Sequence, residues 1–300
     1  MAVIRKKIMG PPGTGKTHRL VHHYLNEEIN NLHTDPQKIA YVTFTKAAAL
    51  DGSKKVQDVF PGVELLYIST LHAMGTRELD ISRKQILTDT KWIQFKNVYP
   101  VYSDINFDSY VNEHGVTINQ DRNLQVINYS RAKLITLEKA CIDLNYHEGA
   151  VDIFRVQQLE RDIEYYKGQK NMYEFSDMIK LFVDEEKHLA LDAIFLDEAQ
   201  DLNPSQWKMF FYIEALCKRS YIAGDDDQTI FKFQGAESNI FIDLEGERDD
   251  QEQSYRVPKA VHEQALKILP HITKRVDKQW YAKKEEGEFI ENCFLEEIDF

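Results

Sequence analysis

The segment Gly10-Pro-Pro-Gly-Thr-Gly-Lys-Thr17 constrains the fold of this 300-residue chain more than any other feature. It has the spacing GxxxxGK[ST] and lies between a predicted strand, Ile4 to Met9, and a predicted helix over 17–32. Glycines in such a loop let successive backbone N–H groups point at phosphate oxygens, and the following helix adds its positive N-terminal end. The segment therefore predicts a phosphate-binding site at the edge of a sheet.

Two side chains of this segment carry specific expectations. Lys16 is expected to contact the β and γ phosphates of ATP, and the Thr17 hydroxyl is expected to bind Mg²⁺. The residues expected to surround the nucleotide are Gly10, Pro11, Pro12, Gly13, Thr14, Gly15, Lys16 and Thr17. A Gly-rich turn without a ligand is the alternative, and the strand and helix on either side disfavour it.

Apolar runs alternate with helical patterns along much of the chain. Further strands are predicted at 38–44, 63–69, 191–196 and 221–223, with a helix after the first of them. Strands separated by helices favour an α/β fold with a mostly parallel sheet. Between about 77 and 190 the patterns are mainly helical, apart from a loop-rich piece at 99–121, which predicts a helical insertion.

The composition excludes several classes of protein. With 43% hydrophobic and 29% charged residues the chain can bury a large core, and its longest apolar runs are too short for a membrane span. Its three cysteines lie far apart, without metal-ligand spacing, which favours the reducing cytoplasm. The net charge of −12 argues against a protein that coats nucleic acid. A locally basic groove remains compatible with it.

A second chemical motif follows the predicted strand at 191–196. Asp197 and Glu198 come directly after four apolar residues, so a strand ending there would direct both carboxylates at the phosphate site. Asp197 is expected to hold Mg²⁺, and Glu198 to orient and deprotonate the attacking water. The alternative is a solvated turn. Asp201 is interpreted as the cap of a helix that starts near Pro204.

Further segments complete a recognisable order. They are Thr43–Ala49, Thr70–Met74, Tyr173–Ile179, Gly224–Ala236 and Gln253–Arg256. Together with the Asp-Glu-Ala-Gln-Asp form of the acidic pair, they resemble the UvrD/Rep/PcrA group of superfamily 1 DNA helicases. The resemblance implies a P-loop NTPase lobe of RecA-like fold, ATP and Mg²⁺ as ligands, and ATP hydrolysis coupled to 3′–5′ movement on single-stranded DNA.

The resemblance also implies roles for individual residues. Gln228 would sense the γ-phosphate, Arg256 would bind it as a permanently charged group, and Tyr255 would stack on adenine. The alternatives are a capping side chain for Gln228, a core aromatic for Tyr255 and a surface base for Arg256. The residues implied to contact DNA are Thr43, Phe44, Thr45, Lys46, Thr70, His72, Phe231 and Phe233. The phenylalanines would stack on bases. A core position is the alternative for Phe231, and a structural histidine for His72.

The chain also departs from the family pattern. The glutamine segment that usually precedes the phosphate loop has no counterpart, and neither do the last two motifs, which belong to a second RecA-like lobe. We therefore expect the second lobe to be largely absent. The expected parts are a first RecA-like lobe (1–76 and 171–257), a helical insertion (77–170) and the start of a second lobe (258–300), with a strand at 289–295.

Three functional hypotheses follow. The first is the ATP-binding part of a DNA helicase. The second is an ATP-binding module that interacts with DNA or protein but has no motor activity. The third, an ATPase of another phosphate-loop family such as a kinase or a clamp loader, is disfavoured by the Gln228 segment and by Tyr255-Arg256.

Overall fold

A six-stranded parallel sheet forms the centre of the computed structural model, which describes residues 3–111, 117–147 and 149–290. The strand order is β3-β2-β6-β7-β1-β8, and every neighbouring pair is parallel. The strands are β1 (Ile4–Met9), β2 (Ile39–Thr43), β3 (Tyr67–Thr70), β6 (Ala193–Asp197), β7 (Arg219–Gly224) and β8 (Glu247–Asp250). This confirms the α/β class and the parallel sheet that the alternating pattern predicts.

The burial of the central strands accounts for the apolar runs in the sequence. β2 and β6 are buried along their whole length, because helices cover both faces of the sheet, and such strands appear as continuous apolar runs. β8 is different. It is largely exposed and acidic, and it is a strand because its backbone pairs with β1 at the sheet edge. Its sequence carries no strand signal, and it was not predicted.

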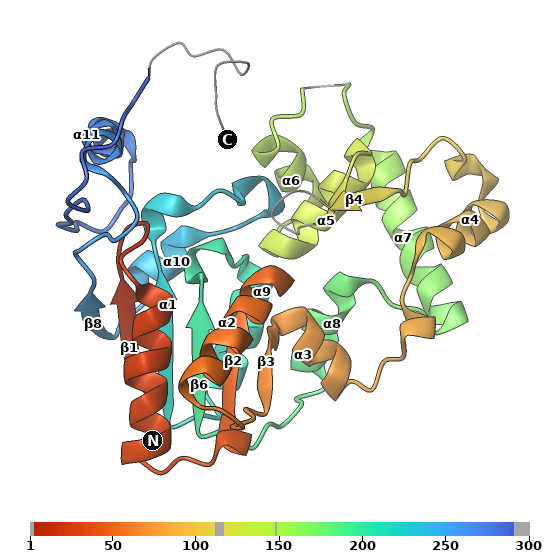
Figure 1. Ribbon diagram of the computed structural model, residues 1–300. Helices are drawn as coiled ribbons and strands as arrows, with labels where there is room; N and C mark the ends of the chain where they lie inside the picture. The colour runs from red at the N-terminus through yellow and green to blue at the C-terminus, as the bar shows by residue number, and fades with distance from the viewer. Residues whose placement is uncertain (1–2, 112–116, 148, 291–300) are drawn as a thin grey trace.

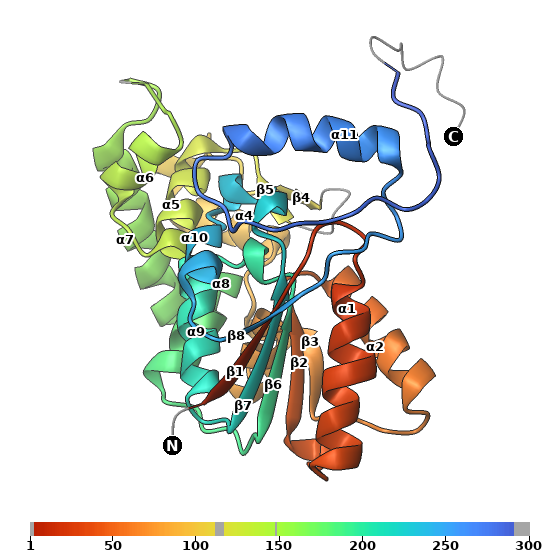
Figure 2. The same ribbon diagram turned by 90° about the vertical axis from the view of Figure 1, so that its left-hand side faces the viewer.

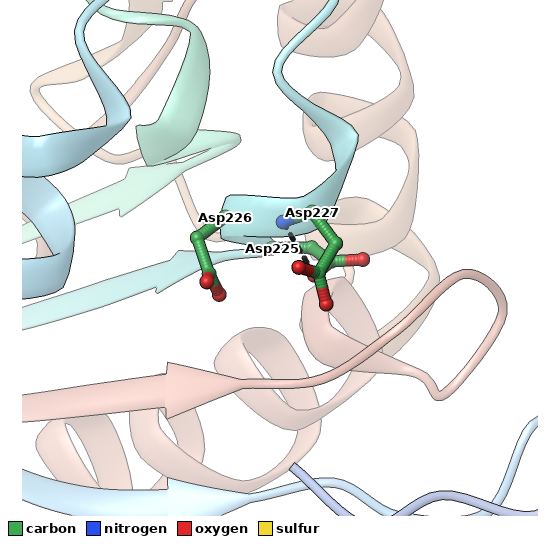
Figure 3. A group of neighbouring side chains, drawn as sticks. All are labelled: Asp225, Asp226 and Asp227. Atoms are coloured by element: carbon green, nitrogen blue, oxygen red, sulfur yellow. Dashed lines mark hydrogen bonds between the residues drawn. The ribbon is translucent and has the colours of Figure 1, made fainter. Parts of the chain in front are cut away.

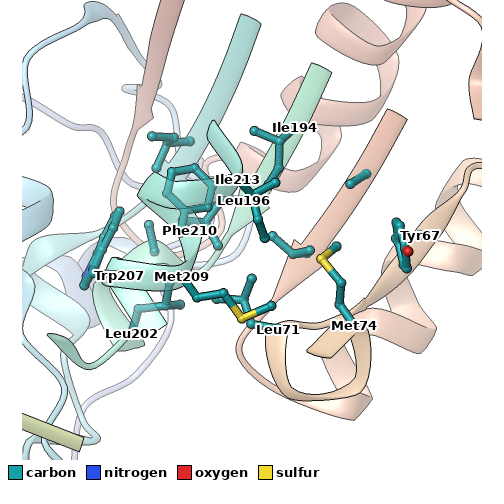
Figure 4. Packing of buried hydrophobic residues seen from close by; sticks show 14 of the residues in the cluster. Tyr67, Leu71, Met74, Ile194, Leu196, Leu202, Trp207, Met209, Phe210 and Ile213 are labelled. Carbon is teal, nitrogen blue, oxygen red and sulfur yellow. The ribbon is translucent and has the colours of Figure 1, made fainter. Parts of the chain in front are cut away.

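Helices cover the two faces of the sheet, as Figures 1 and 2 show. One face carries α2 (Lys46–Val59) and a continuous helical segment made of α1 (Lys16–His18), η1 (Arg19–Leu25) and η2 (Glu27–Asn31). The other face carries α3 (Leu71–Glu78), α8 (Phe175–Asp184), α9 (Pro204–Glu214) and α10 (Ser238–Asp243). On this second face Phe210 and Ile213 of α9 lie beside Ile194 and Leu196 of β6, and Trp207 belongs to the same buried cluster (Figure 4).

Between α3 and α8 the chain leaves the sheet and builds a separate, mainly helical body. Its elements are η4 (Arg83–Gln85), α4 (Asp89–Val98), η5 (Pro100–Tyr102), β4 (Ser109–Val111), β5 (Thr117–Asn119), α5 (Arg122–Lys133), α6 (Leu137–Asp143) and α7 (Ile153–Lys170). A hydrophobic cluster of its own includes Phe95, Tyr102, Val126 and Leu159. The helical character is as predicted, whereas the short β4–β5 hairpin in the loop-rich piece was not predicted.

Several short elements connect the strands and helices. η3 (Pro36–Lys38) directly precedes β2, whereas η6 (Ala199–Asp201) and η7 (Asp226–Gln228) follow β6 and β7 at the carboxyl ends of the strands. The remaining short turns are η8 (Lys232–Gln234) and η9 (Leu269–His271). Figure 2 shows α11 (Lys259–Ile268) and the segment that follows it lying across this end of the sheet. The strand predicted at 289–295 falls mostly outside the described residues, and Phe289 and Ile290 are not in a strand. Within the described ranges, no helix has the length and apolarity needed to cross a bilayer.

Candidate active site

The loop after β1 has the backbone that a phosphate cradle requires. Gly13 and Gly15 have φ angles of 72° and 84°, in the left-handed region where side chains are strained. Gly13 also lies against Arg256, and a Cβ atom there would collide with the Arg256 side chain. The Lys16 ammonium donates to the carbonyls of Gly10 (2.8 Å) and Pro11 (3.3 Å), which places its positive charge inside the loop.

The phosphate loop and the acidic pair meet, although 180 residues separate them. The Thr17 hydroxyl donates to Asp197 Oδ2 at 2.8 Å, and the Tyr41 hydroxyl donates to the same oxygen at 2.8 Å. Asp197 ends β6 and Tyr41 lies on the neighbouring strand β2, so the strand order produces this contact. Tyr41 was not anticipated from the sequence, because nothing but the strand register brings it to Asp197.

The surroundings of Asp197 suit a magnesium ligand. Burial raises the pKa of Asp197, the charge of Glu198 adds to the effect, and the hydroxyls of Thr17 and Tyr41 oppose it. A carboxylate and a hydroxyl side by side are the hard oxygen donors that Mg²⁺ prefers. A divalent ion would also compensate the buried negative charge. The donor set at Thr17 and Asp197 therefore fits the predicted metal.

Glu198 occupies an unusual backbone position. Its φ angle is 57°, left-handed and uncommon for a residue other than glycine, and such positions cluster at functional sites. Its Oε2 accepts from the Gln200 amide at 2.8 Å, and Gln200 Oε1 accepts from the Asp225 backbone N–H at 2.9 Å. Buried Gln200 therefore joins the turns that follow β6 and β7, a role the sequence analysis missed.

The prediction that Asp201 caps a helix is wrong. Asn203 is the cap of α9, since its side chain accepts from the Gln206 N–H at 3.0 Å. Asp201 is buried one turn earlier, and its Oδ1 has no hydrogen-bond partner. Burial, with a further contribution from the Glu198 charge, raises the pKa of Asp201 to about 8.

Gln228 lies on an acidic turn after β7. Its amide donates to Asp225, and the carboxylates of Asp225, Asp226 and Asp227 gather within 4.8 Å of one another (Figure 3). The ammonium of Lys278, from the far end of the described chain, contacts all three. Lys278, like Tyr41 and Gln200, was not anticipated from the sequence, because the Lys- and Glu-rich segment around it resembles an ordinary solvated stretch.

Tyr255 and Arg256 lie directly beside the phosphate loop. The Tyr255 backbone N–H donates to Gly13 O at 2.9 Å, and the Ser254 hydroxyl donates to Pro12 O at 2.8 Å. The Tyr255 side chain is 76% exposed, and Arg256 is exposed too. A core role for this tyrosine is therefore excluded, and both side chains are accessible next to the loop.

The threonines implied to contact DNA have local structural partners. Thr43 is buried and donates to Thr45 O. Thr45 caps α2 by accepting from Ala48, and Thr70 caps α3 by accepting from Ala73. These contacts fix where both helices begin, at the carboxyl ends of β2 and β3.

The other candidate DNA contacts differ in accessibility. Lys46 is exposed at the start of α2. His72 lies in the first turn of α3, where burial lowers its pKa to about 4. Phe231 is 4% exposed, with its ring centroid 5.0 Å from that of Phe44 and 6.2 Å from that of Phe233. Phe233 is 50% exposed, so it presents its ring to solvent while Phe231 supports it from beneath.

A cavity of about 1160 Å³ lies between the sheet-containing lobe and the helical insertion. His72 and Phe233 line it from the lobe, and Trp92 and Arg131 line it from the insertion. Two of the candidate DNA contacts therefore share one concave surface, which the sequence could not show.

Fold and site together define a RecA-like P-loop lobe, with the phosphate loop, the acidic pair and the Gln228 and Arg256 segments at one end of a parallel sheet. Residues 5–249 match the UvrD/REP helicase N-terminal domain. The chain belongs to this family, which confirms the resemblance found in the sequence.

Curated relatives agree with this assignment. The chain is 26% identical over 307 residues to the ATP-dependent DNA helicase PcrA of Bacillus subtilis, and 23% identical over 314 residues to that of Leuconostoc citreum. It is 25% identical over 306 residues to PcrA of Staphylococcus aureus. The alignments cover 93–94% of this chain but 39–40% of the relatives, so the chain spans about two-fifths of their length.

Proposed function

We propose that this chain is the ATP-binding and hydrolysing first lobe of a superfamily 1 DNA helicase that moves 3′–5′ on single-stranded DNA. The observation that carries the proposal is the hydrogen bond from Thr17 to Asp197, which joins the phosphate loop to the acidic pair. The family match and the similarity to ATP-dependent DNA helicases support the assignment of ATP and DNA as ligands.

In the proposed reaction, water attacks the γ-phosphate of ATP. Glu198 orients this water and accepts its proton, while Lys16 and Arg256 balance the charge that develops on the phosphate oxygens. Gln228 senses the γ-phosphate, and Tyr255 stacks on the adenine. Mg²⁺ held by Thr17 and Asp197 would supply further charge neutralisation.

The exposed side chains among the candidate DNA contacts indicate where DNA would bind. Phe233 can stack on a base, and Lys46 can contact a phosphate, since both side chains reach solvent near the carboxyl ends of the strands. We assign 1–76 and 171–257 to the first lobe, 77–170 to the insertion and 258–300 to the start of a second lobe. The separate hydrophobic cluster of the insertion supports this division.

The test is the rate of ATP hydrolysis with and without single-stranded DNA. Glu198→Gln keeps the shape of the side chain but removes the base, so it should reduce turnover by about 10²–10⁴-fold while nucleotide still binds. Glu185→Gln, an exposed change near the end of α8, is the matched control and should leave turnover unchanged. Undiminished hydrolysis by Glu198→Gln would show that Glu198 is not the base.

The same assay separates the motor hypothesis from the alternative. A module that only binds ATP would show nucleotide binding that depends on Lys16 but no DNA-stimulated turnover. The chain corresponds to about two-fifths of each relative's length, so the motor activity of the full-length relatives comes to it only as a proposal. Stimulation of turnover by single-stranded DNA in this 300-residue chain would count against the alternative.

A further inference from the structure

A buried lysine outside all the helicase-like motifs lies at the centre of the acidic turn. Lys278 Nζ is 2.7 Å from Asp225 Oδ1 and 3.0 Å from Asp227 Oδ2, and it also contacts Asp226. The side chain of Lys278 is 2% exposed, and those of Asp225 and Asp226 are fully buried. Figure 3 shows how the three aspartates are grouped on the turn after β7.

This arrangement explains how three carboxylates can be buried together. Their mutual repulsion would be costly without a cation among them. Burial by itself lowers the pKa of Lys278, but the carboxylates, led by Asp225, outweigh it and raise the pKa, so the ammonium stays charged. Arg275 adds two hydrogen bonds of 2.9 Å to Asp227. Two cationic side chains of the same chain, Lys278 and Arg275, therefore offset most of the negative charge of the turn.

Asp225 connects this lysine to the predicted γ-phosphate sensor. Lys278 holds one carboxylate oxygen of Asp225, and the Gln228 amide donates to the other. The Asp225 backbone N–H is fixed as well, because it donates to Gln200, whose amide also binds Glu198. Lys278 therefore fixes the orientation of the Asp225 carboxylate, and this carboxylate in turn orients the Gln228 amide.

The segment that carries Lys278 also contacts the backbone beside Arg256, the other residue expected to bind the γ-phosphate. Val276 N–H donates to Asp226 at 2.7 Å. Further along, Ser254 N–H donates to Tyr281 O at 2.8 Å, and Lys283 N–H donates to Val257 O at 2.9 Å. We call residues 275–283 the strap. It is bonded to the Gln228 turn at one end and to the backbone on both sides of Tyr255-Arg256 at the other.

We propose that Lys278 is a positioning residue for γ-phosphate recognition: by fixing Asp225 it orients Gln228, and through the strap it holds Gln228 and Arg256 in a fixed relation. This assignment rests on the proposed function, because it takes Gln228 and Arg256 as γ-phosphate contacts. It adds a residue that lies outside the helicase-like motifs. Without its ammonium, the repelling carboxylates would move apart, and the Gln228 amide would lose its fixed acceptor.

The test compares affinities for ADP and for a non-hydrolysable ATP analogue, both with Mg²⁺, measured by fluorescence with the 300-residue chain. The ratio of the two dissociation constants reports recognition of the γ-phosphate alone. Lys278→Met should reduce this ratio about tenfold and leave ADP affinity within about twofold. Tenfold corresponds to about 1.4 kcal/mol, close to the lower end of what a hydrogen bond to a charged group contributes. The matched control is Lys274→Met, four residues earlier and paired at the surface with Asp243, which should keep the wild-type ratio.

Two further variants make the result decisive. Lys278→Arg retains the charge and should recover part of the ratio, which a merely structural role would not predict. Asp225→Asn leaves Lys278 paired with two carboxylates, so it tests the same link even if Lys278→Met does not fold. A wild-type ratio in folded Lys278→Met or in Asp225→Asn would overturn the assignment alone. If the wild-type chain bound neither ADP nor the ATP analogue, both the proposed function and the assignment of Lys278 would be refuted.

Discussion

Asp201 offers a sharp test of the electrostatics beside the acidic pair. The carboxyl is buried, one of its oxygens has no partner, and burial with the nearby Glu198 charge raises its pKa to about 8. The folded chain therefore keeps a proton on Asp201 up to about pH 8, whereas the unfolded chain releases it near the usual value of 3.8. Because the folded state binds the extra proton, the stability contributed by Asp201 is lost as pH rises through this window.

The size of the effect follows from linkage. One proton of difference is worth about 1.4 kcal/mol per pH unit, so wild-type stability should fall by about 3 kcal/mol between pH 5 and pH 7 from this group. Asp201→Asn is neutral at every pH and should lack this component. Relative to wild type, the variant should therefore gain about 3 kcal/mol in the free energy of unfolding over the same interval.

The assay is denaturant unfolding of both proteins at pH 5, 6 and 7, without nucleotide or divalent ions. The pH dependence of groups that do not interact with Asp201 cancels in the difference between variant and wild type. Asp58→Asn, an exposed change on α2, is the control and should show a difference that does not vary with pH. If the Asp201→Asn difference were also constant from pH 5 to pH 7, a protonated buried Asp201 would be refuted.

Two other predictions concern the aromatic pair and the boundary of the insertion. Phe233→Ala should weaken binding of single-stranded DNA by about 1–3 kcal/mol with little loss of stability. Replacement of the buried ring, Phe231→Ala, should instead reduce the free energy of unfolding by about 3–5 kcal/mol. Titration with labelled DNA and thermal unfolding measure the two effects, and equal effects of both variants in both assays would contradict the assignment. Lys167, 5% exposed and bonded to Glu174 (3.0 Å) and Asp177 (2.9 Å), joins α7 to α8. Lys167→Met should lower the free energy of unfolding by about 3–5 kcal/mol. The control Lys180→Met, at an exposed ion pair, should change the free energy of unfolding by less than about 1 kcal/mol. Similar values for the two variants would show that the buried network around Lys167 is not needed for stability.

The motif-bearing parts of the fold were predictable because local chemistry decides them. A buried parallel strand is apolar along most of its length, so β2 and β6 were visible in the sequence. A phosphate loop needs glycines with a left-handed backbone, so the loop after β1 was visible too. β8 was not visible, since an acidic edge strand gains its conformation from pairing with β1. The cap of α9 was misassigned to Asp201 because Asp and Asn both suit a cap, and only the backbone shows that Asn203 has that position.

By itself the sequence determined the chemical groups of the site: a loop that can cradle phosphate, two carboxylates after a strand, and a glutamine and an arginine on later segments. Each of these depends on residues that are neighbours in the chain, where geometry is fixed by a few dihedral angles. The tertiary structure alone decided that Tyr41 binds Asp197, that Gln200 joins two turns, that Phe231 is buried against Phe44, and that the Lys278 ammonium lies among three aspartates. Those contacts join residues brought together only by strand order and by the path of the strap, and no local pattern records them.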